Sequence, residues 1–282
     1  MMGRVIVSGA GRLSVPITKL TVSLTPKPGV TYTEGISDLT PDTLSTYAEA
    51  ISNVTGISND VTSVYLDEGA MHRKISVGDS IIVFGGSGSS LTYTYPFDII
   101  GFNHDTLTNP SAYGSPTVTG KAGITLQSHE IFETLFGMNK SDSNEGGWKE
   151  SYMRNTVMIS TEGVWGYIPS AWLSVIKKVN KTSGTGGGTT SGIDTTSDGQ
   201  FLLSQVEVFN STSQSVAGEG AQYSYYKNGG SKIKNWRGNA ENWWLRSPVK
   251  DNNYKFCVSY SDGSIFTVSA SDKLGVAFAF CV

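Results

Sequence analysis

The side chains that most often carry catalysis or metal binding are few in this chain and widely spaced. The three histidines are His72, His104 and His129, and no two stand at the short spacing with which one strand or helix presents two zinc ligands. Cys257 and Cys281 are the only cysteines, which excludes a Cys-rich zinc site and a disulfide framework. We predict two buried free thiols, with one bridge between neighbouring strands as the alternative. The sequence therefore predicts no metal site and no cofactor.

Motifs for nucleophilic and phosphate chemistry are absent as well. No G-x-S-x-G turn joins a strand to a helix, and the glycine run at 184–188 has no lysine after it to complete a phosphate-binding loop. A Ser/His/Asp triad assembled from distant parts of the chain stays open.

Paired carboxylates, which glycoside hydrolysis requires, are the remaining enzymatic option. The candidate acids are Glu207, Glu219, Glu241, Asp98 and Asp105. None of them lies in a recognisable local signature. Glu207 follows an apolar run, and we interpret it as a structural acid that is satisfied by nearby backbone or by Arg154 or Arg246. We therefore predict no catalytic residue.

The composition indicates a folded, loop-rich, β-leaning protein. Only 16% of the 282 residues are charged and 33 are glycine, but aromatic residues reach 11%, which disordered chains lack. The net charge of −3 argues against a nucleic-acid surface, because such a surface needs clustered lysine and arginine. No apolar run approaches the length of about 20 residues that a membrane helix needs, so we expect no membrane insertion.

Residues 1–90 are predicted to form a small β-rich domain for attachment or oligomerisation, with one helix. Thr40 is expected to cap a helix that begins at Pro41 and buries one apolar face. That face comprises Leu44, Tyr47, Ala48 and Ile51. Strands are expected at 4–7, 20–24, 61–66 and 75–84, with a tight turn at Gly78-Asp79. The Gly/Ser-rich segment 85–90 marks the expected boundary.

Residues 91–282 are predicted to form an α+β domain. Helices are expected from Ser128 to Phe136, at 150–155 and from Pro169 to Val179, and a flexible loop at 182–192. The last third is predicted to be β-structure, with strands at 242–247, 255–261, 264–269 and 275–282. Asp262-Gly263 is the strongest hairpin signal in the chain. The last strand is apolar on both faces, which predicts that it is buried.

The segment 243–248 contains two adjacent tryptophans and an arginine. We predict that it is scaffold, because adjacent strand residues face opposite ways, so that one tryptophan is buried and the other covers a neighbouring layer. Arg246 would then pair with an internal carboxylate, and direct ligand contact is the alternative. The stretch that follows is rich in Asn, Asp, Ser and Tyr, the composition that antibody loops use for recognition. Ordinary polar decoration of hairpins is the other interpretation of that stretch.

An ordered series of motifs within residues 92–282 resembles a known family. The motifs lie at 95–105, 147–154, 201–207, 219–223, 243–248 and 275–282. They are similar to the DUF6273-type, C-type-lectin-like domains of bacteria and phages, which share a general plan with the variable proteins of diversity-generating retroelements. The resemblance implies a C-type-lectin-like fold, a mixed sheet with flanking helices, preceded by the small β-rich domain. Residues 1–90 resemble N-terminal regions of gut-phage structural proteins.

The resemblance also implies which positions vary. In retroelement variable proteins, randomised AAY codons yield residues such as Asn, Asp, Ser, Tyr and Phe, but not Lys, Glu, Gln, Met or Trp. Residues 249–274 are mostly of the permitted kinds, with Lys250, Lys255 and Lys273 as exceptions. The Glu-Pro-Asn motif of calcium-dependent sugar binding is absent. Cys281 lies in an apolar strand, which argues against the reactive-cysteine chemistry of the related formylglycine-generating enzymes.

We expect a ligand- or receptor-binding protein without enzymatic activity. It would belong to a phage virion, at a tail or fibre tip, or to the bacterial cytoplasm or cell surface if a non-phage element encodes it. Its partners would be a host cell-surface protein or glycan, other virion proteins through residues 1–90, and further copies of itself, as in a trimer. The expected ligand-binding residues are Asn239, Asn242, Asp251, Asn252, Asn253, Tyr254, Tyr260, Ser261, Asp262, Ser264, Phe266, Ser269, Ser271 and Asp272.

Two other functions stay open from the sequence. One is a phage structural or decoration protein of fixed specificity. The other is an envelope-glycan hydrolase that uses Glu207 or Glu219 as a catalytic acid.

Overall fold

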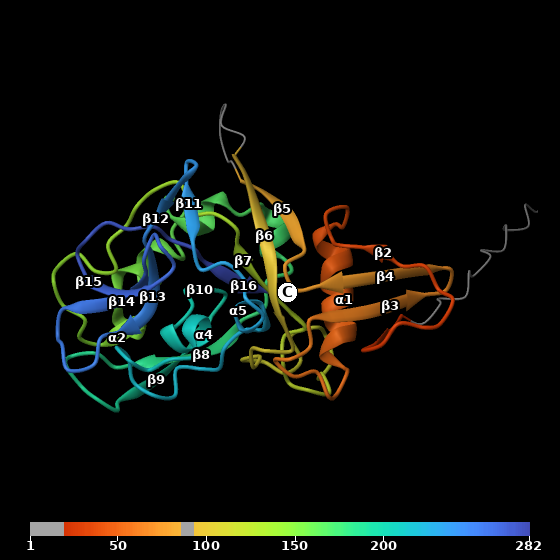
Figure 1. The fold of residues 1–282 in the computed structure, drawn as a ribbon, viewed down its shortest axis with the longest axis horizontal. Coiled ribbons are helices and arrows are strands. Elements are labelled where there is room, and N and C mark those ends of the chain that lie inside the picture. The colour runs from red at the N-terminus through yellow and green to blue at the C-terminus, as the bar shows by residue number, and fades with distance from the viewer. Residues whose placement is uncertain (1–19, 86–92) are drawn as a thin grey trace, which may run out of the picture.

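The computed structural model describes residues 20–85 and 93–282, and the chain there forms an α+β fold built from several small sheets (Figure 1). The strand expected at 4–7 and most of the Gly/Ser-rich segment 85–90 lie outside the described residues. The α+β class expected from the sequence is therefore confirmed.

The N-terminal lobe is a four-stranded sheet with one helix beside it. Its strands follow the order β1-β3-β4-β2. Their bounds are β1 (Thr21–Ser23), β2 (Thr33–Glu34), β3 (Ser63–Glu68) and β4 (Met71–Ser76). Helix α1 (Pro41–Ser52) begins as predicted, because Thr40 Oγ1 accepts a hydrogen bond from the Thr43 N–H at 3.2 Å. All four residues of the predicted apolar face are buried.

A central antiparallel sheet of five strands joins this lobe to the rest of the chain, in the order β10-β16-β7-β6-β5. Its strands are β5 (Ser80–Gly85), β6 (Tyr93–Phe102), β7 (Ile124–Ser128), β10 (Gln200–Phe201) and β16 (Ala279–Cys281). The expected tight turn at Gly78-Asp79 is confirmed, with Gly78 at φ +95°. Because β5 pairs with β6, the change from one sheet to the next falls at 77–79, ahead of the expected boundary near residue 90.

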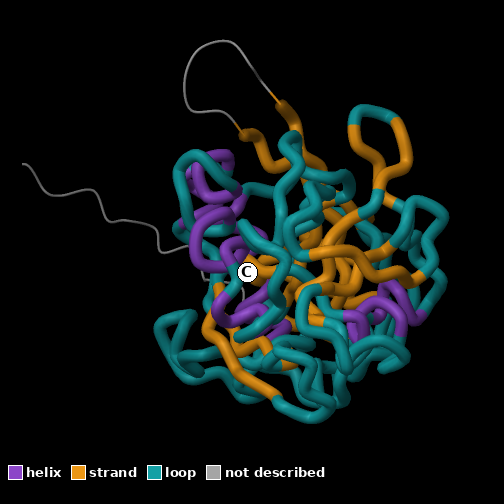
Figure 2. Tube along the Cα trace, turned by 90° about the vertical axis from the view of Figure 1, so that its left-hand side faces the viewer, coloured by secondary structure: helices purple, strands orange, loops and turns teal. Residues whose placement is uncertain are grey.

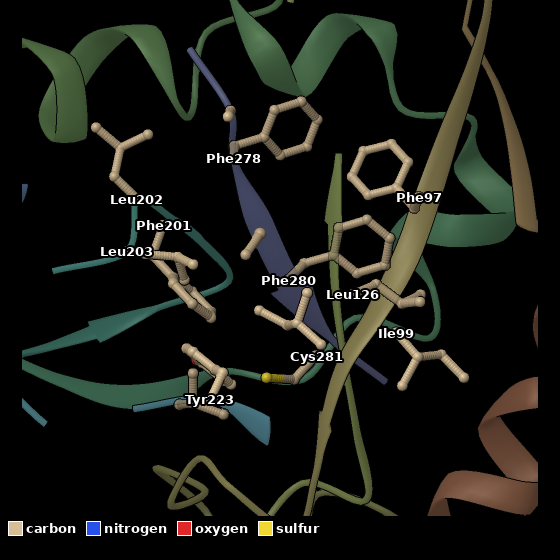
Figure 3. Close-up of a cluster of buried hydrophobic side chains, with 14 of the residues drawn as sticks. Phe97, Ile99, Leu126, Phe201, Leu202, Leu203, Tyr223, Phe278, Phe280 and Cys281 are labelled. Atoms are coloured by element: carbon tan, nitrogen blue, oxygen red, sulfur yellow. The ribbon is translucent and has the colours of Figure 1, made fainter. Parts of the chain in front are cut away.

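The core of the central sheet is aromatic. The ring of Phe97 lies 5.1 Å from the ring of Phe278 and 5.1 Å from that of Phe280, measured between centroids. Figure 3 shows these rings between β6 and the last strand, with the sulfur of Cys281 turned towards Tyr223. All residues from 275 to 282 are buried, as predicted, although only Ala279–Cys281 is a regular strand.

The remaining strands form one three-stranded sheet and two hairpins. The sheet has the order β13-β14-β15, and Figure 1 shows it at the opposite end of the molecule from the N-terminal lobe. Its strands are β13 (Trp243–Pro248), β14 (Lys255–Ser259) and β15 (Ile265–Ser269). The hairpins pair β8 (Val179–Gly184) with β9 (Ile193–Asp198), and β11 (Lys234–Trp236) with β12 (Asn239–Glu241). The turn predicted at Asp262-Gly263 joins β14 to β15, with Gly263 at φ +82°.

Apart from α1, the helices are short pieces between long loops (Figure 2). They are α2 (Gly147–Glu150), the π-helix η1 (Met153–Val157), the 3₁₀-helix η2 (Val164–Tyr167), α3 (Ser170–Leu173), α4 (Gln205–Phe209) and α5 (Ser224–Lys227). The helix expected at 150–155 is interrupted, because Ser151 has an extended backbone with ψ 147°. The helix expected from Pro169 ends at Leu173, and Val179 begins a strand instead.

The helix expected from Ser128 to Phe136 is wrong. The N–H groups of Ile131 and Phe132 donate to Asn235 and Val276, at 2.9 and 2.8 Å, instead of to carbonyls within the same segment. Phe136 forms a β-bridge with Leu274 in the same way. The segment is therefore irregular rather than helical, because these backbone partners come from the last third of the chain.

Of the flexible loop expected at 182–192, residues 185–192 form a loop, whereas residues 182–184 belong to strand β8. Residues 179–198 form the β8–β9 hairpin, and Gly186, Gly187 and Gly188 make its turn with φ between +64° and +76°. The Gly187 N–H donates to the buried side chain of Asn144 at 2.8 Å. The glycines therefore serve a fixed turn that packs against another segment.

The close contact between helix α1 and Gly123 predicts the effect of Gly123→Ala. A Cβ at residue 123 would lie 1.9 Å from the carbonyl oxygen of Ala48 in α1, so the helix has to move. We expect the substitution to lower the free energy of unfolding by about 1–3 kcal/mol or more, measured by urea unfolding. Gly199→Ala is the control, because its Cβ would meet Ile176 at an ordinary 3.6 Å. Equal stability of the two variants would contradict a close contact of α1 with the central sheet.

Candidate functional site

Strand β13 anchors the C-terminal sheet on both of its faces. Trp243 and Trp244 are both fully buried, whereas the sequence predicted one buried tryptophan and one that covers a neighbouring layer. Their indole N–H groups donate in different directions, to Lys232 O at 2.9 Å and to Phe136 O at 2.7 Å. The segments around residues 136 and 232 therefore enclose the strand, and the pair is scaffold, as expected.

The guanidinium of Arg246, on the same strand, lies at the centre of a buried charged network. It forms a two-point ion pair with the carboxylate of Glu207, with Nη2 at 2.9 Å from Oε1. Its remaining N–H groups donate to the carbonyls of Thr182, Leu202 and Glu219. One side chain therefore ties β13 to β8, to α4 and to the loop at residue 219. Of the two basic partners that the sequence offered for Glu207, Arg246 is the one that pairs with it.

The network continues from Glu207 to the central sheet through Lys181. The Lys181 Nζ atom lies 2.7 Å from Glu207 Oε1 and 2.6 Å from Asp105 Oδ1. Asp105 Oδ2 accepts hydrogen bonds from the hydroxyls of Thr125 and Tyr223, at 2.6 and 2.8 Å. The result is an alternating chain of two cations and two carboxylates, in which every charge has a buried partner of opposite sign.

Glu207 is also held by the start of α4. Its carboxylate accepts the Ser204 backbone N–H at 3.0 Å, and its own N–H donates to Ser204 Oγ at 3.1 Å, which is a capping box. The acid is therefore fixed by its own helix as well as by the two cations.

Burial and neighbouring charges shift the pKa values of Asp105, Glu207 and Tyr223 away from neutral pH. Burial alone raises the pKa of Asp105, but the charges of Lys181 and His104 outweigh burial and hold this pKa well below 3.8. Burial raises the pKa of Glu207 too, and Arg246 and Lys181 together bring it below 4.5. Burial raises the pKa of Tyr223 well above 10. General acid–base catalysis works best with a pKa near the operating pH, so this network is suited to holding segments together rather than to moving protons.

A polar cavity of about 330 Å³ lies against this network. Asp105, Lys181 and Glu207 reach its wall, together with His104 and Lys121. His104 is fixed there, because its ring stacks on Tyr223 and its Nε2–H donates to Ala221 O at 3.0 Å. The charged atoms of Asp105, Lys181 and Glu207 at this wall already have buried partners, so these three groups are used by the scaffold.

The other candidate acids of the sequence have separate partners. Asp98 binds Ser80 and lies 2.7 Å from His129 Nδ1, and Glu241 accepts the N–H of Asn242 at 2.8 Å. Glu219 is fully buried and accepts hydrogen bonds from Gly184 N–H and Ser247. Burial raises its pKa above 4.5. Asp105 and Glu207 are therefore the two acids of the set that the structure joins, through a shared lysine.

The sequence-predicted binding residues fall into groups along the C-terminal strands. One group surrounds the β14–β15 turn and contains Asn242, Tyr260, Ser261, Asp262, Ser264 and Phe266. A second lies at the other end of these strands and contains Asp251, Asn252, Asn253, Tyr254, Ser269, Ser271 and Asp272. Asn239 lies apart from both, exposed on the β11–β12 hairpin. The predicted set is therefore brought together as two contact areas rather than one.

Several of the predicted polar side chains bind nearby backbone. Asn242 Oδ1 accepts the Ser261 N–H, and Asn252 Oδ1 accepts the N–H groups of Tyr254 and Lys255, all at 2.8–2.9 Å. Asp262 Oδ1 accepts the Ser264 N–H at 2.8 Å in the turn. These residues shape their loops, which is the ordinary use of Asn and Asp in turns.

The aromatic members of the set are different, because they are exposed apolar side chains. Phe266 is 54% exposed, Tyr254 39% and Tyr260 38%. The rings of Tyr260 and Phe266 lie side by side, 5.2 Å apart between centroids. Lys255 Nζ lies 5.5 Å from the ring centroid of Tyr254 at the other end of the strand. These three rings are the exposed apolar surface of the predicted site. The polar members that are exposed as well are Asn239, Asp251, Asn253, Asp262, Ser264 and Asp272.

Asn144 is a residue that the sequence interpretation missed. Its side chain is fully buried, and its Nδ2 group donates to the carbonyls of Asn252 and Lys255, both at 2.8 Å. Its Oδ1 atom accepts the Gly187 N–H, so one amide holds the 251–254 loop against the β8–β9 turn. The only signal in the sequence is the glycine run at that turn, which does not name its partner.

The cysteines, the metal-binding side chains and the length of the helices can each be compared with the expectations from the sequence. Cys257 and Cys281 are free and buried, as predicted, and burial raises the pKa of both thiols well above 9.0. Among the described residues, no group of three or more His, Cys, Asp and Glu side chains is arranged to hold a metal ion. None of the helices in residues 20–85 and 93–282 has the length and apolarity to cross a membrane.

The network predicts that Gln substitutions of two buried glutamates, Glu207 and Glu219, differ in their effect on the free energy of unfolding. Glu207→Gln is expected to lower the free energy of unfolding by about 3–5 kcal/mol, because Arg246 and Lys181 stay buried without a full countercharge. Glu219→Gln is the matched control, since Glu219 forms no ion pair within the described residues and its hydrogen bonds suit an amide; we expect a change within about 1 kcal/mol. Urea unfolding measures both. Similar losses in the two variants would contradict the central position of Glu207.

The lowered pKa values of Asp105 and Glu207 predict that the free energy of unfolding decreases in acid. Because the folded-state pKa values of Asp105 and Glu207 lie below 3.8 and 4.5, their stabilisation is complete above about pH 4.5 and is lost as the pH falls through the lowered values. Glu219 has the opposite sign, since the stability linked to its raised pKa is complete below 4.5 and is lost as the pH rises through the raised value. Urea unfolding across the acid range should therefore show a shallower acid loss in Glu207→Gln than in the natural chain. An unchanged acid slope would count against the ion pairs.

Comparison with known proteins gives one family. Residues 123–282 match the family described as Domain of unknown function (DUF6273), which is more than half of the 282 residues. The match begins after the 95–105 motif that also suggested the resemblance, so that motif lies outside it. The comparisons with curated proteins and with solved structures gave no match. On the extent of the family match, the chain belongs to the DUF6273 family.

Proposed function

We propose that this protein binds a ligand through the exposed aromatic side chains of the β14–β15 hairpin and its flanks. The observation that carries the proposal is the contrast between Phe266, 54% exposed, and the fully buried tryptophans of β13 two strands away. Aromatic residues on a rigid base supply large contact area at little entropic cost, which is why they dominate binding hot spots.

The register between β14 and β15 places the exposed ring of Phe266 on the same face as buried apolar side chains. Phe266 stands opposite Val258, and Val268 stands opposite Phe256, so these four side chains share one face. Val258 and Phe256 are fully buried, whereas Phe266 at the open end is exposed beside Tyr260. The apolar face of the sheet thus runs from the core to solvent. A pair of exposed aromatic rings at its end is the kind of surface that marks an interaction site.

The two contact areas suggest a broad ligand. In the second area, the ring of Tyr254 lies near the cation of Lys255. Ser264 and Asn253 are small polar residues that are exposed near these rings in the chain, and they can supply hydrogen bonds. We propose a host cell-surface protein or glycan as the ligand, because such partners present both flat and polar surface.

The arrangement of the lobes suits a displayed protein. The N-terminal lobe and the β13–β15 sheet lie at opposite ends of the molecule (Figure 1). We propose that the N-terminal lobe attaches to other virion proteins of a phage, that the C-terminal part has a C-type-lectin-like fold, and that a retroelement diversifies its exposed face. Several copies, as in a trimer, would raise the avidity of weak single sites.

The proposal predicts a separation between binding and stability. Tyr260→Ala and Phe266→Ala should each weaken binding of the purified protein to bacterial cell-envelope fractions by about tenfold or more, because truncation removes aromatic contact area. The melting temperature should stay unchanged, since both rings are exposed. Val118→Ala, at a side chain 65% exposed in another part of the chain, is the control. Loss of the fold on Tyr260→Ala, or equal binding by all three variants, would contradict the proposed face.

A further inference from the structure

Strand β15 is an edge of the C-terminal sheet, and its outer side has no strand beside it in the described part of the chain. On its inner side it pairs with β14 in a regular antiparallel register, from Ile265 opposite Ser259 to Ser269 opposite Lys255. None of the five residues of β15 is buried. An open edge of this kind presents backbone N–H and C=O groups to which another strand can bind.

Two hydrogen bonds at the ends of the β14–β15 ladder show which backbone groups of β15 point outward. The Tyr260 N–H donates to Ser264 O at 2.8 Å, and the Ala270 N–H donates to Tyr254 O at 2.9 Å. The backbone groups of an antiparallel strand point to its two sides alternately, residue by residue. The even-numbered residues from 264 to 270 therefore face β14, and residues 265, 267 and 269 face outward.

Ile265 and Thr267 are the outward residues whose backbone groups are both free. Within residues 20–85 and 93–282, neither residue has a hydrogen bond to its N–H or its carbonyl oxygen. Ser269 differs, because its carbonyl accepts the Asp272 N–H at 3.0 Å. Two residues at alternate positions, each with a free donor and a free acceptor, offer the pattern that an antiparallel partner strand uses.

The strand lacks the features by which natural edge strands avoid such pairing. Its sequence Ile-Phe-Thr-Val-Ser contains no charge and no proline, and its register with β14 has no bulge. The edge strand β9 is different, because it contains Asp194 and Asp198. The edge of β15 is therefore free to pair with another strand.

A second copy of the same strand is complementary to this edge. In an antiparallel pair with its two-fold axis at Phe266, Ile265 of each copy exchanges hydrogen bonds with Thr267 of the partner subunit, so that all of these free groups are used. Phe266 then lies opposite Phe266 of the partner subunit, at a position where side chains across the ladder are closest. Asp262, the acidic residue nearest to Phe266 in the chain, comes opposite Ala270 of the partner subunit and meets no like charge.

We infer that two copies of this chain pair through β15 and form one continuous sheet around a two-fold axis. The occupant of the edge is a second copy because the same free groups and the same exposed ring stand on both sides of that axis. Pairing at an edge leaves the faces of the sheet open, so the rings of Tyr260 and Phe266 from both copies lie on one shared face. The inference goes beyond the proposed function and does not rest on it, because pairing is measured without a ligand.

Analytical ultracentrifugation of the full chain tests the inference. The mass should rise from the 30.2 kDa of one chain to twice that value as the concentration increases. We expect this rise between about 1 and about 300 μM, because a contact between two single strands is a small interface. Hydrogen exchange at the amides of Ile265 and Thr267 should slow by about tenfold or more over the same range. A mass of one chain throughout would overturn the inference.

Thr267→Pro is the decisive variant. Proline removes the outward N–H and leaves the ladder to β14 intact, so the melting temperature should change little while the Kd of the dimer rises about tenfold or more. Thr195→Pro is the matched control, because Thr195 is exposed and its backbone faces outward on the edge strand β9. We expect the control to dimerise as the natural chain does.

Phe266→Lys tests the same pairing without a change to the backbone, and it decides the question if Thr267→Pro fails to fold. Phe266 is exposed, so the fold should be kept, but the register places the two new charges opposite each other and should weaken the dimer by about tenfold or more. A dimer that persists unchanged in the folded variants, or an equal loss in Thr195→Pro, would overturn the inference.

Discussion

The ion pair between Arg246 and Glu207 is the interaction on which the arrangement of the C-terminal part depends. Two buried charges are stable in a protein interior only when their hydrogen-bonding groups are all used. Here the guanidinium also binds carbonyls at Thr182, Leu202 and Glu219, and the carboxylate also binds Lys181 and the start of α4. The requirement to satisfy one arginine therefore fixes four segments of the chain relative to β13.

This constraint explains how the C-terminal sheet can be held firmly at β13 while β15 stays exposed at its edge. Strand β13 is held from both faces, by the network and by the two buried tryptophans. β14 pairs with β13, and β15 pairs only with β14 among the strands, so it forms the edge of the sheet. Side chains at the end of this edge pair, such as Tyr260 and Phe266, do not hold the fold together. Their exposure is consistent with a surface that can change while the scaffold stays the same.

The sequence predicted the elements whose causes are local and missed those whose causes are distant. The cap at Thr40, the turn at Asp262-Gly263 and the buried last segment follow from neighbouring residues, and all are confirmed. The segment from Ser128 to Phe136 has helical spacing, but its backbone pairs with residues more than 100 positions away. The partnership of Glu207 with Arg246 could be offered as one of two options, whereas Lys181 between two acids had no signal.

The candidate sites show the same limit. The exposed aromatic residues were within the predicted stretch, but periodicity could not show that Asn252 and Asp262 bind backbone while Tyr260 and Phe266 face solvent. The buried amide of Gln200, whose Nε2 has no partner among the described residues, was not predicted either, because such a group becomes visible only when the chain is folded around it. Which polar groups are satisfied is a property of the tertiary contacts.

We propose that a fixed buried scaffold carries a contact face that varies between copies of this gene. Deep sequencing of the gene segment that encodes residues 234–282, across its natural population, distinguishes the two regions. We expect substitutions concentrated at exposed positions such as Tyr254, Tyr260 and Phe266, with the codons of Trp243 and Arg246 constant. A uniform segment, or substitutions as frequent at buried as at exposed positions, would contradict it.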